Sequence, residues 1–196
     1  MKKISIVFFS GSGHTQLMAE AVQRGAASVP GTEAELIRIS GSDITEGRWK
    51  NESILPKIGA SDAVIFGTPT YMGGPSWQFK RFADASSKAW FHGKWKNKVA
   101  AGFTNSASMN GDKVQTLNYL FALSMQQGMV WVGTGMMPAN SKAAQRNDVN
   151  WLGAFSGAMA QSPSDSSPEE GPLPGDLETA RLFGQRVAET AARWNR

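Results

Sequence analysis

The chain has 196 residues, enough for one domain with a sizeable hydrophobic core, and a mildly basic net charge of +4. It contains no cysteine and two histidines, which excludes disulfides, thiolate metal sites and cysteine nucleophiles, so we expect no metal. No basic run is long enough for a nucleic-acid arm, and no apolar segment is long enough to span a membrane. We therefore expect a cytoplasmic protein with no nucleic-acid or membrane partner.

The first third of the chain alternates between strand and helix patterns. Residues 4–9 form a nearly continuous apolar run, too short for a signal peptide and typical of a central parallel strand. Residues 15–28 change to a helical period with one apolar stripe. Residues 33–39 alternate as in an edge strand, and the polar residues 43–59 predict a short helix within loops.

The alternation continues in the middle of the chain. Residues 62–67 predict a third strand, and a helix should start at about Pro75, because proline suits the first helical position. The residues of this helix that should face inward are Phe79, Phe82 and Ala83. Residues 94–98 alternate basic and aromatic side chains, which we interpret as a solvated turn before a strand and not as a nucleic-acid contact.

The last part of the chain combines two strands, two helices and a long loop. Residues 99–104 and 129–133 predict the fourth and fifth strands, and Asp112 should cap the helix between them. Residues 134–175 are rich in Gly, Pro, Ser and Asn and predict a long loop, which could be a lid, a subunit contact or a disordered segment. Asp176 should cap the last helix. The buried stripe of that helix should contain Ala180, Gly184, Val187, Ala188 and Ala191.

Five strands that alternate with helices predict an open α/β fold, a doubly wound parallel sheet with helices on both faces, formed by residues 1–196 as one domain. Ligands of such sheets bind beyond the carboxyl ends of the strands. The loops after the first, third and fourth strands, residues 10–15, 68–75 and 105–111, have unusual compositions. We expect these three loops to converge in space.

The first loop, Ser10-Gly11-Ser12-Gly13-His14-Thr15, opens a helix and suits an anion. A helix N-terminus offers free backbone N–H groups and a partial positive charge, and glycine lets the backbone approach a ligand closely. The loop contains no Lys or Arg, so it would hold a phosphate by neutral dipoles alone. The alternative is a glycine-containing helix start without a ligand.

Two other phosphate-binding motifs are excluded by single positions. A Walker A loop needs Gly-Lys-Ser/Thr, where His14-Thr15 stands here. A Rossmann fingerprint needs a third glycine where Gln16 stands, and an acidic residue about 20 positions later, where Ile39-Ser40 stands. A terminal monophosphate, as in FMN, fits the loop better than a buried pyrophosphate.

The second and third loops turn a phosphate site into a candidate flavin site. Residues 68–74 combine a rigid proline turn, an aromatic residue and two glycines, so their backbone N–H groups could face the edge of a flavin. Residues 104–112 can add backbone and hydroxyl groups. Each loop alone could be an ordinary turn, but three such loops at one sheet edge favour a shared ligand.

These motifs resemble a known family. The loop from Ser10 to Thr15 resembles the phosphate loop of flavodoxin-like proteins, and Gly-Thr-Pro-Thr-Tyr-Met-Gly at 67–73 resembles the second flavin loop of WrbA-type NAD(P)H:quinone oxidoreductases. The resemblance covers nearly the whole chain. It implies a flavodoxin-like fold with strand order 2-1-3-4-5 and non-covalently bound FMN.

The resemblance also implies which residues contact FMN. The phosphate would lie on Ser10, Ser12, Gly13, His14 and Thr15. The isoalloxazine would be lined by Pro69, Thr70, Tyr71, Met72 and Gly73. The ribityl chain and the other edge of the ring would be lined by Thr104, Asn105, Ser106, Ala107, Ser108 and Gly111.

No catalytic side chain is assigned, because the flavin would carry the chemistry. Candidates for lining the substrate pocket are Tyr71, Trp90 and His92. Trp90 falls where the relatives place a tryptophan beside the flavin, although it could equally pack against the protein. His92 is close to Trp90 and could reach a quinone oxygen, or it could be a surface residue. His14 should support the phosphate loop rather than carry protons.

The chain departs from the WrbA pattern at two places. Tyr71-Met72 replaces an Arg-Phe pair, and residues 105–110 replace a glycine-rich third loop. These differences indicate a sister branch, a flavodoxin-family NAD(P)H-dependent oxidoreductase. The implied reaction is hydride transfer from NAD(P)H through FMN to a quinone or similar small acceptor, in a homodimer or homotetramer.

Two alternatives remain open. A flavodoxin-type one-electron carrier is typically strongly acidic, so that it docks on basic partners, whereas this chain is basic. The segment 134–175 would also be more useful as a lid or subunit contact than on a small carrier. The other alternative is a flavin-binding regulatory or scaffolding protein without turnover.

Overall fold

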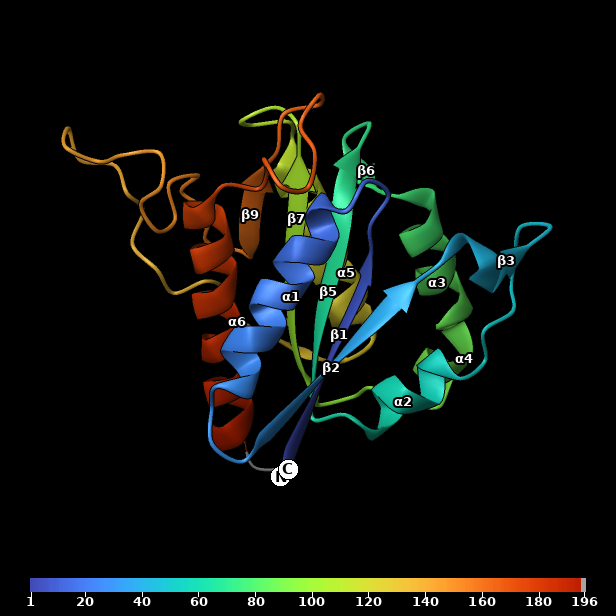
Figure 1. Ribbon diagram of the computed structural model, residues 1–196. Coiled ribbons are helices and arrows are strands. Elements are labelled where there is room, and N and C mark those ends of the chain that lie inside the picture. The colour runs from blue at the N-terminus through green and yellow to red at the C-terminus, as the bar shows by residue number, and fades with distance from the viewer. Residues whose placement is uncertain (195–196) are drawn as a thin grey trace.

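The computed structural model describes residues 1–194, which form a parallel sheet between two layers of helices (Figure 1). The strand order is β2-β1-β5-β7-β8, and all neighbours on this path are parallel. These strands are β2 (Thr32–Ile39), β1 (Lys2–Phe9), β5 (Ala63–Tyr71), β7 (Val99–Ser106) and β8 (Val130–Trp131). Among the principal strands this is the predicted order 2-1-3-4-5, which confirms the flavodoxin-like, doubly wound α/β fold.

The described sheet has seven strands rather than the predicted five, because two short strands join it near its carboxyl edge. β6 (Gly74–Pro75) pairs antiparallel with the end of β5. β9 (Ala158–Gln161) pairs with residues 103–106 of β7, beyond the point where β8 ends. The fifth strand predicted at 129–133 is therefore shortened to β8, and a strand lies within the segment predicted as a long loop.

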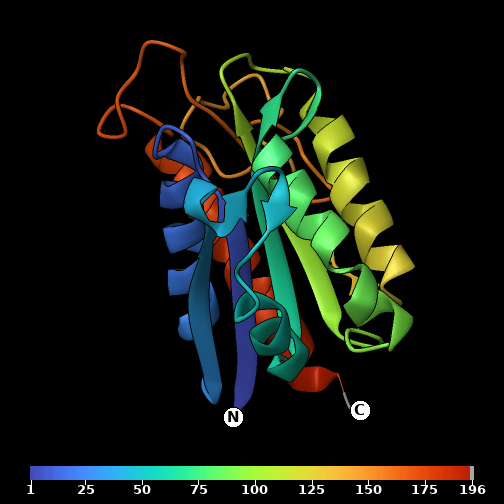
Figure 2. The same ribbon diagram turned by 90° about the vertical axis from the view of Figure 1, so that its right-hand side faces the viewer.

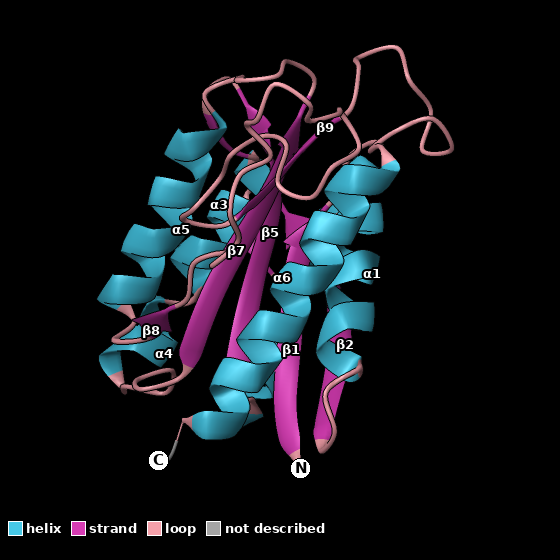
Figure 3. Ribbon diagram, turned by 90° about the vertical axis from the view of Figure 1, so that its left-hand side faces the viewer, coloured by secondary structure: helices cyan, strands magenta, loops and turns pink. Residues whose placement is uncertain are grey.

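One face of the sheet is covered by α1 (His14–Ala27) and α6 (Pro174–Arg193), which lie side by side (Figure 3). Glycines allow this close approach. A Cβ on Gly25 would lie 1.8 Å from the carbonyl oxygen of Arg181, and a Cβ on Gly184 would lie 2.1 Å from that of Val22. The predicted apolar stripe of the last helix is buried, which confirms it.

The other face is covered by four helices and a small hairpin (Figure 2). The helices are α2 (Ile54–Ala60), α3 (Trp77–Ala85), α4 (Ser87–Phe91) and α5 (Lys113–Gln126). The hairpin contains β3 (Ile44–Thr45) and β4 (Arg48–Trp49), after the 3-10 helix η1 (Gly41–Asp43). The residues of α3 predicted to face inward, Phe79, Phe82 and Ala83, are buried. None of the described helices is both long and apolar enough to cross a membrane.

Three predicted helix starts differ in detail. Pro75 belongs to β6, and Ser76 caps α3 by accepting a backbone hydrogen bond over 3.3 Å. Asp112 precedes α5 as predicted, but its φ is +51° and its side chain does not cap the helix. The last helix starts at Pro174, so Asp176 lies inside its first turn and not at its cap. Proline fits that first position because its missing N–H needs no partner there.

The segment 94–98 is the predicted turn before a strand, with Lys94, Lys96 and Asn97 exposed, but two of its side chains are not solvated. Trp95 is fully buried and stacks against Phe82, with ring centroids 6.2 Å apart. Lys98 is also buried and donates a hydrogen bond to the carbonyl oxygen of Gly59 over 2.8 Å. The prediction is wrong for these two side chains, because the indole ring gains more from the aromatic core than from solvent and Lys98 finds backbone acceptors.

Candidate functional site

The three loops predicted to converge follow β1, β5 and β7 at one edge of the sheet, opposite the N-terminus (Figure 1). The first two are in contact, because a Cβ on Gly11 would lie 2.6 Å from the hydroxyl oxygen of Tyr71. The strands beneath the second and third loops are also linked, since Thr70 Oγ1 lies 2.8 Å from Thr104 Oγ1 and 2.7 Å from Thr116 Oγ1. The predicted convergence is therefore confirmed.

The first loop, which we call the phosphate loop (residues 10–15), presents an uncapped helix N-terminus. Ser10 Oγ accepts a hydrogen bond from the N–H of Gly13 over 3.1 Å, and Gly13 adopts a φ of +99°, which glycine tolerates. No side chain of the described residues caps α1, and its first turn contains no acidic residue. Thr15 is buried, and no described residue bonds to its hydroxyl. These N–H groups and this hydroxyl are thus available to an anion.

The His14 ring holds the phosphate loop in shape. Its Nε2 lies 3.1 Å from the carbonyl oxygen of Ser166, and its Nδ1 lies 3.2 Å from Oγ of Ser12. Because a carbonyl oxygen only accepts, Nε2 donates to Ser166; in the tautomer with the proton on Nε2, Nδ1 accepts the hydroxyl proton of Ser12. The hydroxyl of Ser12 therefore already has a partner within the protein, whereas that of Thr15 has none among the described residues.

The chain after β9 covers this loop. In addition to the contact between His14 and Ser166, a Cβ on Gly13 would lie 2.8 Å from Cγ of Pro168. Residues 166–168 belong to the segment predicted as a long loop. Part of that segment is therefore a cover over the phosphate loop.

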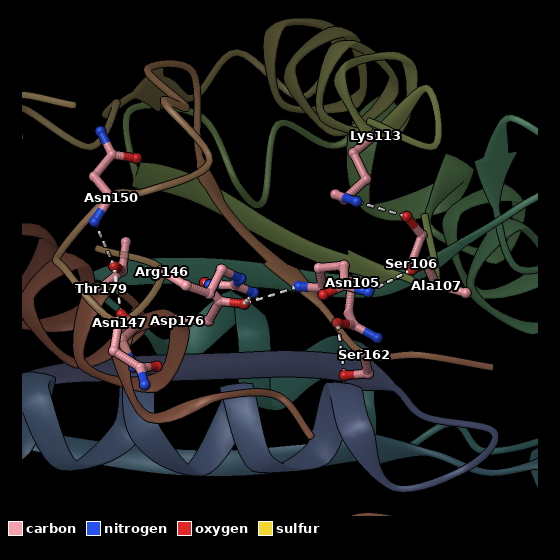
Figure 4. A network of polar contacts seen from close by, with 12 residues as sticks. Asn105, Ser106, Ala107, Lys113, Arg146, Asn147, Asn150, Ser162, Asp176 and Thr179 are labelled. Carbon is pink, nitrogen blue, oxygen red and sulfur yellow. Dashed lines mark hydrogen bonds and ion pairs between the residues drawn. The ribbon is translucent and has the colours of Figure 1, made fainter. Parts of the chain in front are cut away.

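A buried carboxylate ties the rest of the segment to the sheet (Figure 4). Arg146 donates two hydrogen bonds to Asp176, over 2.9 and 2.7 Å. The same carboxylate accepts the backbone N–H of Gln161 in β9 over 2.9 Å. The side chain of Gln161 in turn donates to the carbonyl oxygen of Ala107 over 2.7 Å. Asp176, in α6, is thus bonded to Arg146, in the segment 132–157 between β8 and β9, and to Gln161 in β9. Through Gln161 it is linked to the third loop.

The second loop is a tight hairpin turn between β5 and β6. Tyr71 pairs with Gly74, so Met72 and Gly73 form a two-residue turn in which φ is +48° and +76°. Positive φ at both positions is typical of a type I′ turn. The side chain of Met72 is fully exposed and that of Tyr71 is 47% exposed. The turn therefore presents an open apolar surface beside the phosphate loop.

The part of the third loop that follows β7, residues 107–112, is held by the side chain of Lys113 (Figure 4). Its Nζ donates to Oγ of Ser106 over 2.7 Å and to the carbonyl oxygen of Ser108 over 2.5 Å. Burial lowers the pKa of Lys113 from 10.5 to about 8, against the opposing attraction of Asp176.

Asn105, near the end of β7, is buried and accepts a hydrogen bond from Ser162 over 3.1 Å.

The structure brings all residues predicted to contact FMN to this edge. They are Ser10, Ser12, Gly13, His14, Thr15, Pro69, Thr70, Tyr71, Met72, Gly73, Thr104, Asn105, Ser106, Ala107, Ser108 and Gly111. Trp90 and His92 are not brought there, because they lie in α4 and just after it, near the opposite edge (Figure 1). His92 instead lines a groove of about 720 Å³ together with Trp49 and Arg81. Within one chain, Trp90 and His92 do not meet the three loops.

Two cations beside the loops are missed by the sequence motifs. Arg38, near the end of β2, donates to the carbonyl oxygen of Ser10 over 3.3 Å and to the side chain of Gln16 over 2.8 Å. Arg38 therefore places a positive charge beside a loop that itself contains no Lys or Arg and that the sequence predicts to hold a phosphate by neutral dipoles alone. Lys113 is the second missed cation. The only available signals in the sequence are that Arg38 lies one residue before the end of the strand next to β1 and that Lys113 follows the third loop.

This arrangement fits FMN. The uncapped start of α1 suits a single phosphate, and the exposed hairpin turn suits a flat aromatic ring. The polar end of β7 and the third loop offer hydroxyl and backbone groups to the rest of the cofactor. An open parallel sheet with these features at its carboxyl edge defines the class of flavodoxin-like FMN proteins.

Comparison with known proteins identifies the family. Residues 4–144 match the model of the NADPH-dependent FMN reductases, and the chain belongs to this family. It is 46% identical over 189 residues to Flavodoxin FldP of Pseudomonas aeruginosa (strain UCBPP-PA14), with 96% of each chain covered. It is 33% identical over 206 residues to an NAD(P)H dehydrogenase (quinone) of Geotalea uraniireducens (strain Rf4), covering 97% of this chain and 98% of the relative.

A solved structure extends the comparison to the fold. The crystal structure of the flavodoxin, WrbA-like protein from Agrobacterium tumefaciens is 46% identical, with a TM-score of 0.76 over the full length of both chains. Together with the family, these relatives make the chain a WrbA-type, flavodoxin-like oxidoreductase with FMN as cofactor and NAD(P)H as electron donor. The predicted family, enzyme class and cofactors are thus confirmed, while one relative is named a flavodoxin and another an NAD(P)H dehydrogenase (quinone).

Proposed function

We propose that the chain catalyses the two-electron reduction of a quinone or similar small acceptor by NAD(P)H. The observation that carries this proposal is the hairpin turn, where Tyr71 and Met72 form an open apolar surface beside the phosphate loop. Nicotinamide and quinone rings are flat, and flat rings pack well on such surfaces. When bound, FMN supplies the redox chemistry by taking a hydride from the donor and passing its electrons to the acceptor.

The residues of the chain would bind and orient the cofactor. The first-turn N–H groups of α1 and the hydroxyl of Thr15 would hold the phosphate, and Arg38 adds a positive charge nearby. His14 keeps the loop in shape through Ser12 and Ser166. The hairpin turn and the third loop would lie along the ring. This arrangement requires no side-chain acid or base, so positioning is the main contribution of the protein.

Residues 1–196 would form a single FMN-binding domain that works in the cytoplasm, as a homodimer or homotetramer. A second copy would have to bring Trp90 and His92 to the open edge, because one chain keeps them near the opposite edge. Trp90 is 47% exposed and His92 is exposed, so both are accessible to another copy.

A flavodoxin-type one-electron carrier is the second candidate, and the 46% identity to a protein named Flavodoxin FldP favours it. Carriers dock on protein partners through complementary charge. The net charge of +4 would require an acidic partner here. The two candidates therefore differ in their acceptor, a small flat molecule or a redox protein.

Steady-state turnover tests the proposal. The chain is reconstituted with FMN and mixed with NADH or NADPH and benzoquinone, and oxidation of the nucleotide is followed. We expect many turnovers per chain. Thr15→Val should need more added FMN to reach the same rate, whereas Thr45→Val, an exposed control position in β3, should not. A chain that retains FMN but reduces only a redox protein, with no repeated turnover on benzoquinone, would support the carrier instead.

A further inference from the structure

Lys113 is a buried cation at the base of the third loop (Figure 4). It is the first residue of α5, and it is only 1% exposed. Its ammonium group donates hydrogen bonds to Oγ of Ser106 and to the carbonyl oxygen of Ser108, over 2.7 and 2.5 Å. Both acceptors are neutral oxygen atoms at the carboxyl edge of the sheet.

This ammonium group forms no ion pair with any residue from 1 to 194. The carboxylate that attracts it, Asp176, is already bound by Arg146 and by the backbone of Gln161. Arg146 also acts on Lys113 with a charge of the same sign. Burying a charge without a partner costs free energy, and a neutral side chain could hold the loop at a lower cost. The buried cation therefore points to a negative charge that comes from outside the chain.

Ser106 links this cation to the proposed cofactor. It is the last residue of β7 and lies among the residues expected along the flavin. Because the ammonium group of Lys113 donates to a lone pair of Ser106 Oγ, the hydroxyl proton of Ser106 points away from Lys113. Among residues 1–194, that proton meets only the carbonyl oxygen of Ser108, at 3.3 Å. A hydroxyl polarised by an ammonium group is a stronger donor toward an anion.

We propose that Lys113 is a positioning residue that raises the electron affinity of the bound flavin through Ser106. This inference rests on the proposed function. A hydride carries one proton and two electrons, so the ring that receives it from NAD(P)H gains one negative charge, and the nucleotide leaves as NAD(P)⁺. A buried ammonium group without a counter-ion favours that added charge.

The midpoint potential of bound FMN tests this inference without turnover. FMN-loaded wild type, Lys113→Gln and Lys113→Arg are reduced with dithionite in the presence of reference dyes. We expect Lys113→Gln to lose about tenfold in its preference for reduced over oxidised FMN, a shift of about 30 mV to more negative potential for a two-electron couple. Lys113→Arg keeps the charge and should retain most of the wild-type value. Lys88→Gln removes an exposed lysine of α4 and should change nothing.

Ser106→Ala provides an independent variant if Lys113→Gln does not fold. It keeps the lysine, removes the hydroxyl and should shift the potential in the same direction. The inference is overturned if the folded variants bind FMN with the wild-type potential, or if Lys113→Arg shifts it as much as Lys113→Gln. Because dithionite replaces NAD(P)H and no quinone is present, a shifted potential in a chain without turnover would contradict the proposed function alone.

Discussion

The hydroxyl of Tyr71 lies over Gly11, so close that a Cβ on Gly11 would come within 2.6 Å of it. This contact joins the hairpin turn after β5 to the phosphate loop after β1. The two loops therefore form one continuous wall of the proposed cofactor site. A side chain at position 11 would have to displace the half-exposed ring of Tyr71.

Gly11→Ala should disturb the site and leave the fold intact. The colliding atom is the end of a half-exposed side chain that can move, so Tm should change little. The displaced ring should weaken FMN binding by roughly fivefold, about 1 kcal/mol. Tyr71→Phe removes the colliding oxygen, so Gly11→Ala should have little further effect in that background. Fluorescence titration of FMN on the double-mutant cycle measures this coupling, and strictly additive effects would contradict the contact.

Thr15→Val and Ser12→Ala should differ in their effects on FMN affinity. The hydroxyl of Ser12 is engaged by His14, whereas that of Thr15 has no partner among the described residues. Hydrogen bonds to charged groups contribute about 1.5–3 kcal/mol, so Thr15→Val should weaken FMN binding by roughly tenfold or more. For Ser12→Ala we expect FMN binding to weaken by less than about threefold.

Riboflavin is the matched control for this pair, because it lacks the phosphate. Thr15→Val should bind riboflavin as wild type does in the same fluorescence titration. An equal loss for both ligands, or a larger loss in Ser12→Ala, would show that the loop does not hold the phosphate in the proposed way.

Gly25→Ala should destabilise the fold through the packing of α1 on α6. The new Cβ would lie 1.8 Å from the carbonyl oxygen of Arg181, a backbone atom that cannot turn aside. We expect a loss of about 3 kcal/mol in the free energy of unfolding. Gly59→Ala in α2 is the control, because within residues 1–194 no atom outside its own stretch of helix lies within 4 Å of an added Cβ. Since alanine favours helices over glycine by up to about 1 kcal/mol, that variant should be as stable as wild type or more so in urea unfolding.

The free energy of unfolding should rise with pH between about 8 and 10.5 because of Lys113. Burial lowers its pKa from 10.5 to about 8 in the folded chain. Between these values the unfolded chain binds more protons than the folded chain, and stability then increases with pH. Below about pH 8 the lysine is charged in both states, so the cost of burying the charge is present in full. Lys113→Met removes this titration.

Urea unfolding of wild type and Lys113→Met at several pH values measures the effect. The stability of wild type relative to the variant should be constant below about pH 8 and should increase above it. A constant difference across the whole range would mean that the lysine is not buried as a charge.

Local sequence patterns predict most of this fold. The apolar runs at 4–9 and 62–67 predict β1 and β5 correctly, because a parallel strand covered on both faces is apolar throughout. Local sequence patterns do not predict β9. Its residues Ala158–Gln161 are few and of modest strand propensity, and they pair with β7 only because residues 132–157 return the chain to the sheet. Trp95 likewise looks like part of a surface turn until its aromatic neighbours are known.

The candidate site is predictable where a backbone motif specifies it. Gly13 and Gly73 have positive φ within the two loops that the motifs identify. The charged residues of the site depend on tertiary packing instead. Lys113 is buried because the third loop folds over it, and Arg38 reaches Ser10 from an edge strand. Sequence alone therefore predicts the loops but not their cations.

The most direct measurement is an anaerobic single-turnover experiment on the FMN-loaded chain. One equivalent of NADH or NADPH is added while the visible absorbance of the bound flavin is followed, and one equivalent of benzoquinone is added next. A two-electron quinone reductase should show loss of this absorbance with the nucleotide and full recovery with the quinone, each at least as fast as steady-state turnover. An absorbance that neither nucleotide bleaches, or that benzoquinone does not restore, would contradict the proposed function.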